Sequence, residues 1–533
     1  MTDTAFYEIL KNKVDNVTKE RCVAVTLTFE SMAFLNNAEQ MSPEWKQLAK
    51  CLTALKKEKK LSDQRKKELK QDEKLSDQRK QELEQDEKLS NQRKKELEQV
   101  RDKLKDKITA HNQAEFPLAS LKGGLRYWWR ALQWVPTKLK AIQENEKTKQ
   151  LPEDEASIDE IALKDLHQSE RALWGSAEES EGIGCSKVRI IPQNNQIQIC
   201  RSSDIFKSNK TKKQDKISSI QYIAGQAYKL DKGELSDMSP LRPVATSKET
   251  ISFLLHFSPE LSETHIRQVF EALLCFAEFG GLGSRSRKGF GSFSVSFTQS
   301  LIKENGEALS QQKLHEQFIH TIKHERIHSS AITNWRIPPI PAFSAATKWT
   351  QFSVDKKMTD KQLLVELGNA YKTARLQIGL GDKNRIFNSP PQYPARLQVG
   401  FPLVTNRLVI DKNHSPKNIE KRTNYSMFYL DKEVKRRGSL VFLSCKLTDT
   451  GKYSIHALLL SSDFLPKNSS AKKPSYLQLS DAISPSKKTH YKNIDFNPKD
   501  VTDELFGTGG FFAELTKNLN HSQYISQQSV VAG

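Results

Sequence analysis

Four stretches of the chain alternate between apolar and polar residues with a period of two. Such alternation is typical of a β-strand with one face against a hydrophobic core. The stretches cover residues 23–29, 187–190, 251–257 and 293–297. Their apolar positions are Val23, Val25, Leu27 and Phe29, then Val188 and Ile190, then Ile251, Phe253, Leu255 and Phe257, and last Phe293, Val295 and Phe297.

Two stretches between these strands follow the 3.6-residue period of an amphipathic helix. The first, residues 116–132, reads FPLASLKGGLRYWWRAL, and we predict that Ser120 caps its N-terminus. The second covers residues 266–277, and Gly280 follows it in the position of a helix-ending glycine. The apolar faces carry Leu121, Leu125, Trp128 and Leu132 in the first helix and Ile266, Phe270, Leu273 and Ala277 in the second.

The order of elements from residue 22 to residue 297 is strand, helix, strand, strand, helix, strand. This is the βαββαβ pattern of a ferredoxin-like (RRM-like) α+β domain, with long insertions after the first strand and around the second. We place this domain at residues 20–300. An additional helix is predicted at 161–174, after a polar linker near 143–159. It carries His167 and Glu170, which lack a partner motif for a metal site, so we interpret them as part of a solvated face.

The largest insertion, residues 46–110, contains a 14-residue repeat. From Leu61 to Asp102 the sequence reads LSDQRKKELKQDEK, LSDQRKQELEQDEK and LSNQRKKELEQVRD, with twelve basic and twelve acidic residues. This composition favours a helix supported by opposite charges four residues apart. Two leucines per repeat are too few for a stable coiled-coil seam. We therefore predict a solvent-exposed helical hairpin or rod that serves as a spacer.

A glycine-rich stretch lies between the helix at 266–277 and the strand at 293–297. Residues 279–293 read FGGLGSRSRKGFGSF, with cations at Arg285, Arg287 and Lys288. Such a backbone can approach a ligand closely and turn several N–H groups toward one anion. A dinucleotide-binding loop would instead follow a strand and open a helix, and it would have Gly where this chain has Ser286. We predict a loop that holds a phosphate backbone.

A second candidate for anion binding is the helix at 116–132. Beside its apolar face lies a stripe of three cations and one aromatic residue, Lys122, Arg126, Trp129 and Arg130. Gly123 and Gly124 fall in the predicted first turn, where free N–H groups attract phosphate. Stacking on an aromatic ring flanked by cations is a common way to hold single-stranded nucleic acid. The alternative is a buried tryptophan pair with snorkelling arginines, and we adopt it for Trp128.

Composition supports a polyanionic partner. The 533 residues carry a net charge of +19, and the pI is near 9.4. Clustered Lys and Arg gain affinity for nucleic acid by releasing counterions, although many basic proteins bind none. The six cysteines include no Cys-x-x-Cys pair, which argues against a zinc site and a disulfide framework. No apolar run reaches the length of a membrane span, so we expect a cytoplasmic protein without membrane contact, metal or cofactor.

The two motifs together resemble the RAMP superfamily of CRISPR proteins. The form Lys-Gly-x-Leu-Arg-x-Trp-Trp-Arg at 122–130 is similar to subunit one of the Cmr (type III-B) effector complex. Residues 171–176 (RALWGS) and 186–188 (SKV) match its next block. The resemblance covers roughly residues 23–297, apart from the repeat insertion.

This resemblance implies a non-catalytic RNA-binding subunit in antiviral defence. It would lie near the 3′ end of the guide RNA (crRNA), beside a neighbouring Cmr RAMP subunit, and would contact target RNA. Carried over by position, the candidate RNA contacts are Lys122, Arg126, Trp129, Arg130, Lys187, Arg285, Arg287 and Lys288. The glycines that would shape the loop are Gly281, Gly283, Gly289 and Gly291.

The resemblance also implies a second, degenerate ferredoxin-like domain, which we place at residues 301–520. A helix at 363–376 and strands at 440–447 and 453–460 are predicted there. The family's Arg-Arg-x-Ser-Pro-Leu segment appears as RRGSL at 436–440, without the proline, so an RNA contact and a solvated turn remain equal alternatives. We expect the tail at 521–533 to be disordered.

Two other functions remain open. A metal-independent RAMP endoribonuclease would use a His, Tyr or Lys to activate a 2′-OH and so process guide RNA precursors. The first 110 residues contain no histidine, and His167 and His256 have no evident acid–base partner. A coiled-coil adaptor would use the repeats but would leave the glycine-rich stretch unexplained.

Overall fold

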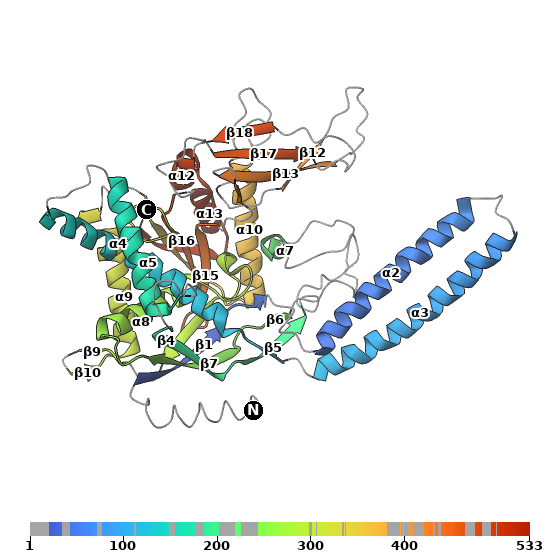
Figure 1. Ribbon diagram of the computed structural model, residues 1–533, viewed down its shortest axis with the longest axis horizontal. Helices are drawn as coiled ribbons and strands as arrows, with labels where there is room; N and C mark the ends of the chain where they lie inside the picture. The colour runs from blue at the N-terminus through green and yellow to red at the C-terminus, as the bar shows by residue number, and fades with distance from the viewer. Residues whose placement is uncertain are drawn as a thin grey trace.

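The computed structural model has helices and sheets in two neighbouring units, with a long helical hairpin projecting from one side (Figure 1). It describes residues 21–34, 43–71, 77–110, 113–148, 155–176, 185–201, 219–224, 243–297, 301–304, 306–332, 335, 337–380, 395, 398, 404–408, 420–429, 432–434, 439–463, 475–481, 492–496 and 498–532. The predicted α+β class is confirmed. The arginines at 436 and 437 lie outside these residues.

The first unit is built on a four-stranded antiparallel sheet in the order β4-β7-β1-β8. Val25 of β1 lies opposite Phe253 of β7 and Phe297 of β8, so the apolar residues of neighbouring strands share one face. The strands are β1 (Cys22–Phe29), β4 (Val188–Asn194), β7 (Thr250–Phe257) and β8 (Phe293–Phe297). Their order along the chain, with helices after β1 and β7, is the order predicted from the alternation.

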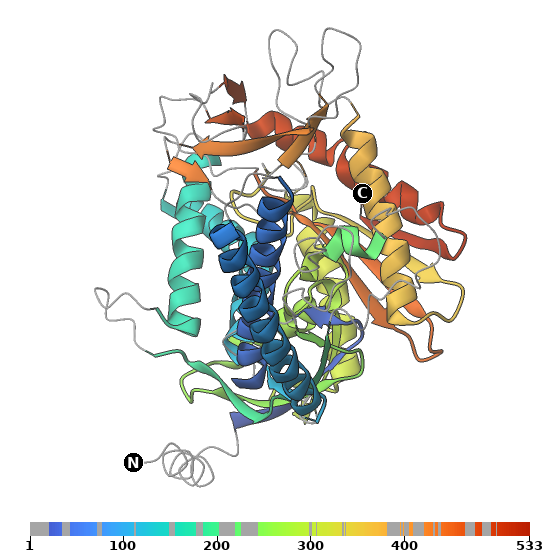
Figure 2. The ribbon, with the colours of Figure 1, turned by 90° about the vertical axis from the view of Figure 1, so that its right-hand side faces the viewer.

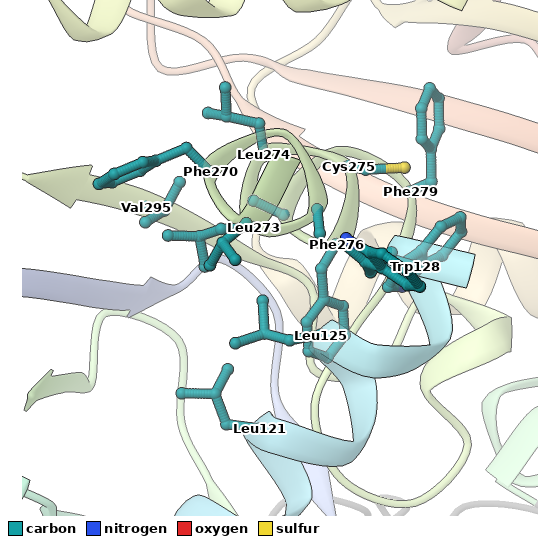
Figure 3. Packing of buried hydrophobic residues seen from close by; sticks show 14 of the residues in the cluster. Leu121, Leu125, Trp128, Phe270, Leu273, Leu274, Cys275, Phe276, Phe279 and Val295 are labelled. Atoms are coloured by element: carbon teal, nitrogen blue, oxygen red, sulfur yellow. The ribbon is translucent and has the colours of Figure 1, made fainter. Parts of the chain in front are cut away.

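Two helices of this unit pack against each other, α4 (Leu118–Thr148) and α8 (Glu263–Phe279). Figure 3 shows Leu125 and Trp128 of α4 beside Phe276 of α8, with Val295 of β8 nearby. The predicted apolar faces of both helices are therefore in the core.

The start of α4 differs from the prediction. The helix begins at Leu118, because the Ser120 amide already donates to the carbonyl of Pro117 at 3.0 Å and closes the first turn. The predicted cap at Ser120 is therefore wrong. The predicted linker is also too long, since α4 runs to Thr148 and α5 starts at Glu155 and ends at Trp174.

The repeat region has the form of an antiparallel hairpin of two helices, α2 (Pro43–Gln71) and α3 (Asp77–Ala110). Figure 1 shows it extending away from the two units, and in Figure 2 it points toward the viewer in front of them. The Ser90 hydroxyl donates to the Glu58 carboxylate at 2.9 Å, which fixes the register of the pair. Few side chains on it are buried, among them Leu55, Leu83 and Leu104, as expected from two leucines per repeat.

The second unit repeats the arrangement of the first. Its sheet has the order β15-β16-β11-β19, with all neighbours antiparallel. Its strands are β11 (Lys348–Val354), β15 (Val441–Leu447), β16 (Tyr453–Leu459) and β19 (Ile525–Ala532). Helix α10 (Asp360–Ile378) follows β11, and helices α12 (Pro498–Phe506) and α13 (Phe511–Asn520) precede β19.

The prediction of a disordered tail is wrong. Residues 525–532 form the edge strand β19, which pairs with β11. The hydroxyls of Ser353 and Ser526 lie 2.8 Å apart across this pair. The partner strand is more than 170 residues away in the sequence, so the short polar tail gives no local sign of the pairing.

The remaining elements are shorter. One antiparallel sheet consists of β2 (Ala33–Phe34), β6 (Pro243–Ala245), β5 (Gln196–Arg201) and β3 (Gln113–Glu115). Another consists of β12 (Val404–Leu408), β13 (Glu420–Tyr429), β14 (Lys432–Val434), β17 (Ser475–Asp481) and β18 (Lys492–Phe496). The others are α7 (Ser219–Ala224), β9 (Lys303–Glu304), β10 (Glu307–Ala308), α9 (Gln311–Thr321), the π-helix η6 (Ile322–Ile327) and the 3₁₀ helices η5 (Ser286–Lys288) and η7 (Ser330–Ile332).

Candidate nucleic-acid interface

The glycine-rich loop, residues 279–293, lies at the junction of the two units. Its Gly289 amide donates to the Leu443 carbonyl of β15 at 3.0 Å, and its Ser292 hydroxyl accepts from the Cys445 amide at 3.0 Å. Within the first unit, the amides of Ser284 and Gly291 donate to carbonyls of the segment after β1. These amides are therefore committed to protein carbonyls, which corrects the expectation that the loop turns its N–H groups toward an anion.

The loop needs its glycines for its shape. Gly283, Gly289 and Gly291 have φ angles of +88°, +85° and +66°, in the left-handed region that favours glycine. A Cβ atom on Gly291 would lie 1.9 Å from the Leu282 carbonyl oxygen, and one on Gly281 would lie 2.7 Å from that of Phe290. The loop is thus tightly folded, and its backbone lies close to that of its neighbours.

A cleft of about 500 Å³ brings the two sequence motifs together. Gly124 and Tyr127 of α4 line one side, and Gly281, Gly283 and Arg287 of the loop line the other. The contribution of the second unit to the cleft comes from β15. An anion or an aromatic base that enters the cleft would meet residues of both motifs.

Arg287 is fixed at this cleft by aromatic rings. Its Cζ atom lies 4.7 Å from the ring centroid of Phe442 and 5.5 Å from that of Tyr127, and its guanidinium donates to the Ser439 carbonyl. A cation over a ring face is attracted by the ring quadrupole. Arg287 thereby keeps a positive charge at the cleft without a carboxylate partner among the described residues.

The cationic stripe of α4 lies on a different side of the helix and does not line the cleft. Arg126 Nε is 2.8 Å and Arg130 Nη1 is 3.7 Å from the carboxylate of Glu170 on α5. The Glu170 side chain is only 6% exposed, so its assignment to a solvated face is wrong. Burial and, next, the Arg126 charge lower the pKa of Lys122. Two of the three cations are therefore already compensated by a buried carboxylate.

Trp129 is buried, with 2% of its surface exposed, and belongs to the core of the first unit. It cannot act as an accessible stacking platform, which corrects the prediction. The helix starts three residues earlier than the predicted cap at Ser120 implies, so Gly123 and Gly124 lie beyond its first turn and their amides are inside the helix. A Cβ atom on Gly124 would lie 2.1 Å from the Phe276 ring, so this glycine allows α4 and α8 to pack closely.

Two further predicted residues are at other edges of the first unit. Lys187 precedes β4, and its Nζ lies 2.9 Å from the Glu260 carboxylate in a largely exposed ion pair. Arg285 has a φ of +64°, an uncommon conformation for a residue with a Cβ atom, which costs about 1–2 kcal/mol. The loop holds Arg285 in this conformation next to η5, which carries Arg287 and Lys288.

Lys288 points away from the cleft toward the second unit. Its Nζ lies 4.5 Å from the ring centroid of Tyr371 on α10. Burial and, next, the positive charges of Arg285 and Arg375 lower the pKa of Lys288 to about 7. A lysine in this position is sensitive to any anion that approaches it.

Several residues at the junction could not be predicted from the sequence. The rings of Tyr127 and Phe442 contact Arg287, and the charge of Arg375 acts on Lys288, but Phe442 and Arg375 lie in a unit with no motif of its own. A buried Glu278 carboxylate also lies 3.2 Å from His456 Nδ1 and 3.4 Å from His315 Nε2. Tyr127 could have been inferred from its position, because it lies three residues after Gly124 on the face of α4 opposite the cationic stripe.

The sequence matches the model of the RAMP superfamily over residues 97–294, a segment that contains both motifs. The resemblance inferred from the motifs is thereby confirmed. No curated protein matches the chain. No group of three or more potential metal ligands occurs among the described residues, and none of the described helices is long and apolar enough to cross a membrane.

Several solved structures are similar to the chain at low identity. One is the apo crystal structure of Cmr1 from Pyrococcus furiosus, with 18% identity and a TM-score of 0.36, covering 66% of this chain and 82% of that one. Another is a chain of the type III-B Cmr-beta complex bound to cognate target RNA, with 13% identity and a TM-score of 0.35, covering 76% of this chain and 93% of that one.

Proposed function

We propose that this chain, which matches the RAMP superfamily over residues 97–294, is an RNA-binding subunit of a type III-B CRISPR (Cmr) effector complex in antiviral defence. It would hold the 3′ region of the guide RNA, the target RNA or both, beside another Cmr RAMP subunit, without cutting RNA. The observation that carries the proposal is the meeting of both family motifs at a single cleft that also holds Arg287.

The topology supports two RAMP domains in tandem. In each unit the chain runs strand, helix, strand, strand, helix, strand, and the second and third strands lie at one side of the sheet. This is the arrangement of a ferredoxin-like domain, and the helical hairpin α2–α3 is an insertion into the first. We keep the boundaries at 20–300 and 301–520 for the two domains, with the insertion at 46–110.

In this proposal the side chains of the loop, not its amides, bind the RNA. Arg287 would pair with a backbone phosphate, and Tyr127 beside it offers a ring to a base. Arginine holds its charge at every physiological pH and can donate two parallel hydrogen bonds to a phosphate. The exposed Lys187 pair and the stripe on α4 would add long-range attraction at the periphery.

The absence of cleavage is part of the proposal. A metal-independent nuclease needs an acid–base residue that reaches the 2′-OH. Among the described histidines, His456 has the shortest carboxylate contact, and it is 4% exposed and enclosed at the junction. An endoribonuclease therefore remains only as an outcome of the test.

The test uses the full chain and a 5′-labelled single-stranded RNA at several salt concentrations. We expect binding that weakens with salt and leaves the RNA intact in the presence and absence of EDTA. Arg287→Gln should weaken binding and lower the slope of log affinity against log salt by about 0.7, the value for one lost phosphate contact on a single strand.

Arg93→Gln is the matched control, because Arg93 is exposed on the hairpin and loses the same charge. It should bind like the wild type, and the thermal midpoint of each variant shows whether it is folded. Absence of salt-dependent RNA binding by the wild type would refute RNA binding, and EDTA-resistant cleavage abolished by one His substitution would establish the nuclease. Sequencing of RNA that co-purifies with the chain from its native host, with identification of the associated subunits, tests the assignment to a Cmr complex.

A further inference from the structure

Three cations from both units converge at the end of the loop that faces away from the cleft. Lys288 lies over the ring of Tyr371, whose hydroxyl is close enough to Arg285 and Arg375 for both charges to act on it. Arg375 Nη1 donates to the hydroxyl of Tyr222 on α7 at 3.0 Å, and its Cζ lies 5.8 Å from the Tyr222 ring centroid. The loop, α7 and α10 thus each supply a side chain to one cluster.

Two glycines allow these elements to approach one another. A Cβ atom on Gly289 of the loop would lie 2.7 Å from the Leu367 side chain of α10. One on Gly368 of α10 would lie 2.4 Å from the Ser219 carbonyl oxygen of α7. At Gly368 a larger residue would require a shift of the backbone, and at Gly289 the φ of +85° would strain it, so the cluster is a built feature of the junction rather than a chance meeting of mobile side chains.

Two cations of the cluster, Lys288 and Arg375, carry positive charge that no described carboxylate balances. Among the described residues, neither Lys288 nor Arg375 has a carboxylate within ion-pair distance, and Arg375 Nε is buried without a hydrogen-bond partner. Both neighbouring charges that act on Lys288 are positive, and together with burial they lower its pKa. Cations held together in this way repel one another, and an anion between them would relieve the repulsion.

We propose that Arg285, Lys288 and Arg375 form a second anion subsite, with the Tyr222 hydroxyl holding Arg375 in place, and that this subsite takes a backbone phosphate of RNA. The inference rests on the proposed function and extends it, because it adds the second unit to the RNA path. Arg287 and Lys288 are consecutive residues of η5 and face opposite sides of the loop. RNA that leaves the cleft would therefore cross the loop and reach α10.

The ligand of the subsite is a phosphate group, which RNA, a free nucleotide or inorganic phosphate could supply. We commit to RNA because the subsite adjoins the loop that also lines the cleft. Arg375→Gln should lower the affinity for single-stranded RNA about tenfold, as expected for the loss of a hydrogen bond between charged groups. It should also reduce the slope of log affinity against log salt by about 0.7.

Lys361→Gln is the control, since Lys361 is exposed at the other end of α10 and removes the same charge from the same helix. Tyr222→Phe separates positioning from charge: it should weaken RNA binding without changing the salt slope. The thermal midpoint of each variant, measured without ligand, identifies any that fail to fold. Inorganic phosphate is the second probe, and its stabilisation of the wild type and of Arg375→Gln is compared.

The outcomes distinguish the two proposals. If the wild type binds RNA and Arg375→Gln binds it as tightly as Lys361→Gln does, the subsite is refuted while the proposed function stands. If the wild type binds no RNA, the proposed function fails. In that case, phosphate that raises the thermal midpoint of the wild type but not of Arg375→Gln supports an anion subsite for a free phosphate compound and refutes the RNA assignment. A folded wild type that responds to neither probe refutes both.

Discussion

The pKa of Lys288, about 7, makes RNA binding depend on pH in a range where arginine does not titrate. The Lys288 ammonium is about 90% protonated at pH 6 and about 10% protonated at pH 8, as follows for a group with this pKa. A bound phosphate favours the charged form, so binding takes up a proton over this range. If only charged Lys288 contacts the phosphate, RNA affinity should fall about tenfold from pH 6 to pH 8.

The surroundings of Lys288 identify the group responsible. Arg285 of the loop and Arg375 of α10 keep their charges, and burial raises the pKa of Tyr371 far above this range. Lys288→Arg retains a charge that cannot titrate and should have a flat affinity profile between pH 6 and pH 8. Fluorescence anisotropy with a labelled single-stranded RNA measures both profiles at constant ionic strength. Equal pH dependence in the wild type and Lys288→Arg would refute this reasoning.

Three other outcomes follow from the structure. Gly291→Ala should lower the thermal midpoint and reduce the free energy of unfolding by more than about 2 kcal/mol, because the new Cβ would lie 1.9 Å from a carbonyl oxygen. Gly306 has a similar φ but open space around it, so Gly306→Ala should reduce the free energy of unfolding by only about 1 kcal/mol. Glu278→Gln should destabilise the chain by about 3 kcal/mol in urea denaturation, because it removes the buried charge between two histidines, and Glu316→Gln on the exposed face of α9 should have little effect. Replacement of Leu61–Lys88 by a short Gly-Ser turn should shorten the hairpin in register and leave RNA affinity within about twofold; a tenfold loss would place the hairpin in the RNA path.

Acid should act on the Glu278 cluster in a defined direction. Burial raises the pKa of Glu278, but the charge of His456, a hydrogen bond from His315 and the charge of Lys446 together lower it to about 2. Burial lowers the pKa of His456 below its usual value of 6.5, so this histidine contributes its charge only in acid. The folded pKa is below the usual value of 4.5, so the stabilisation is present above pH 4.5 and is lost as the pH falls toward 2. The stability difference between wild type and Glu278→Gln should therefore shrink over this range in chemical denaturation. A difference that stays constant would show that the carboxylate charge does not stabilise the junction.

Local patterns were enough to predict the elements of the first unit. Alternation identified β1, β7 and β8 because one face of each strand packs on the core, and the 3.6-residue period identified α4 and α8 for the same reason. Helix ends were less predictable. Ser120 has the residue type of a cap, but the first turn of the helix already begins at Pro117, before Ser120 in the chain. The edge strand at 525–532 was missed because its partner is distant in the sequence.

The site was predictable in its residue types and not in its contacts. Both motifs line the cleft, yet Arg126 and Arg130 of α4 turn to Glu170 on α5. The residues that face the cleft from α4 are instead Ala119, Ser120, Gly124, Tyr127 and Trp128. A helical wheel gives the faces of α4 but cannot say which face α5 covers. The same holds for Lys288, whose partner Tyr371 belongs to the second unit. Such contacts arise from tertiary packing, and no local spacing encodes them.

The central claim is that RNA lies in the cleft between the two motifs. Ultraviolet crosslinking of a bound single-stranded RNA, followed by mass spectrometry of the crosslinked peptides, tests it most directly. We predict crosslinks at Tyr127 of α4 and on the loop that carries Arg287, and their loss in Arg287→Gln at equal salt. Crosslinks confined to the α2–α3 hairpin, or unchanged at Tyr127 in Arg287→Gln, would contradict the account.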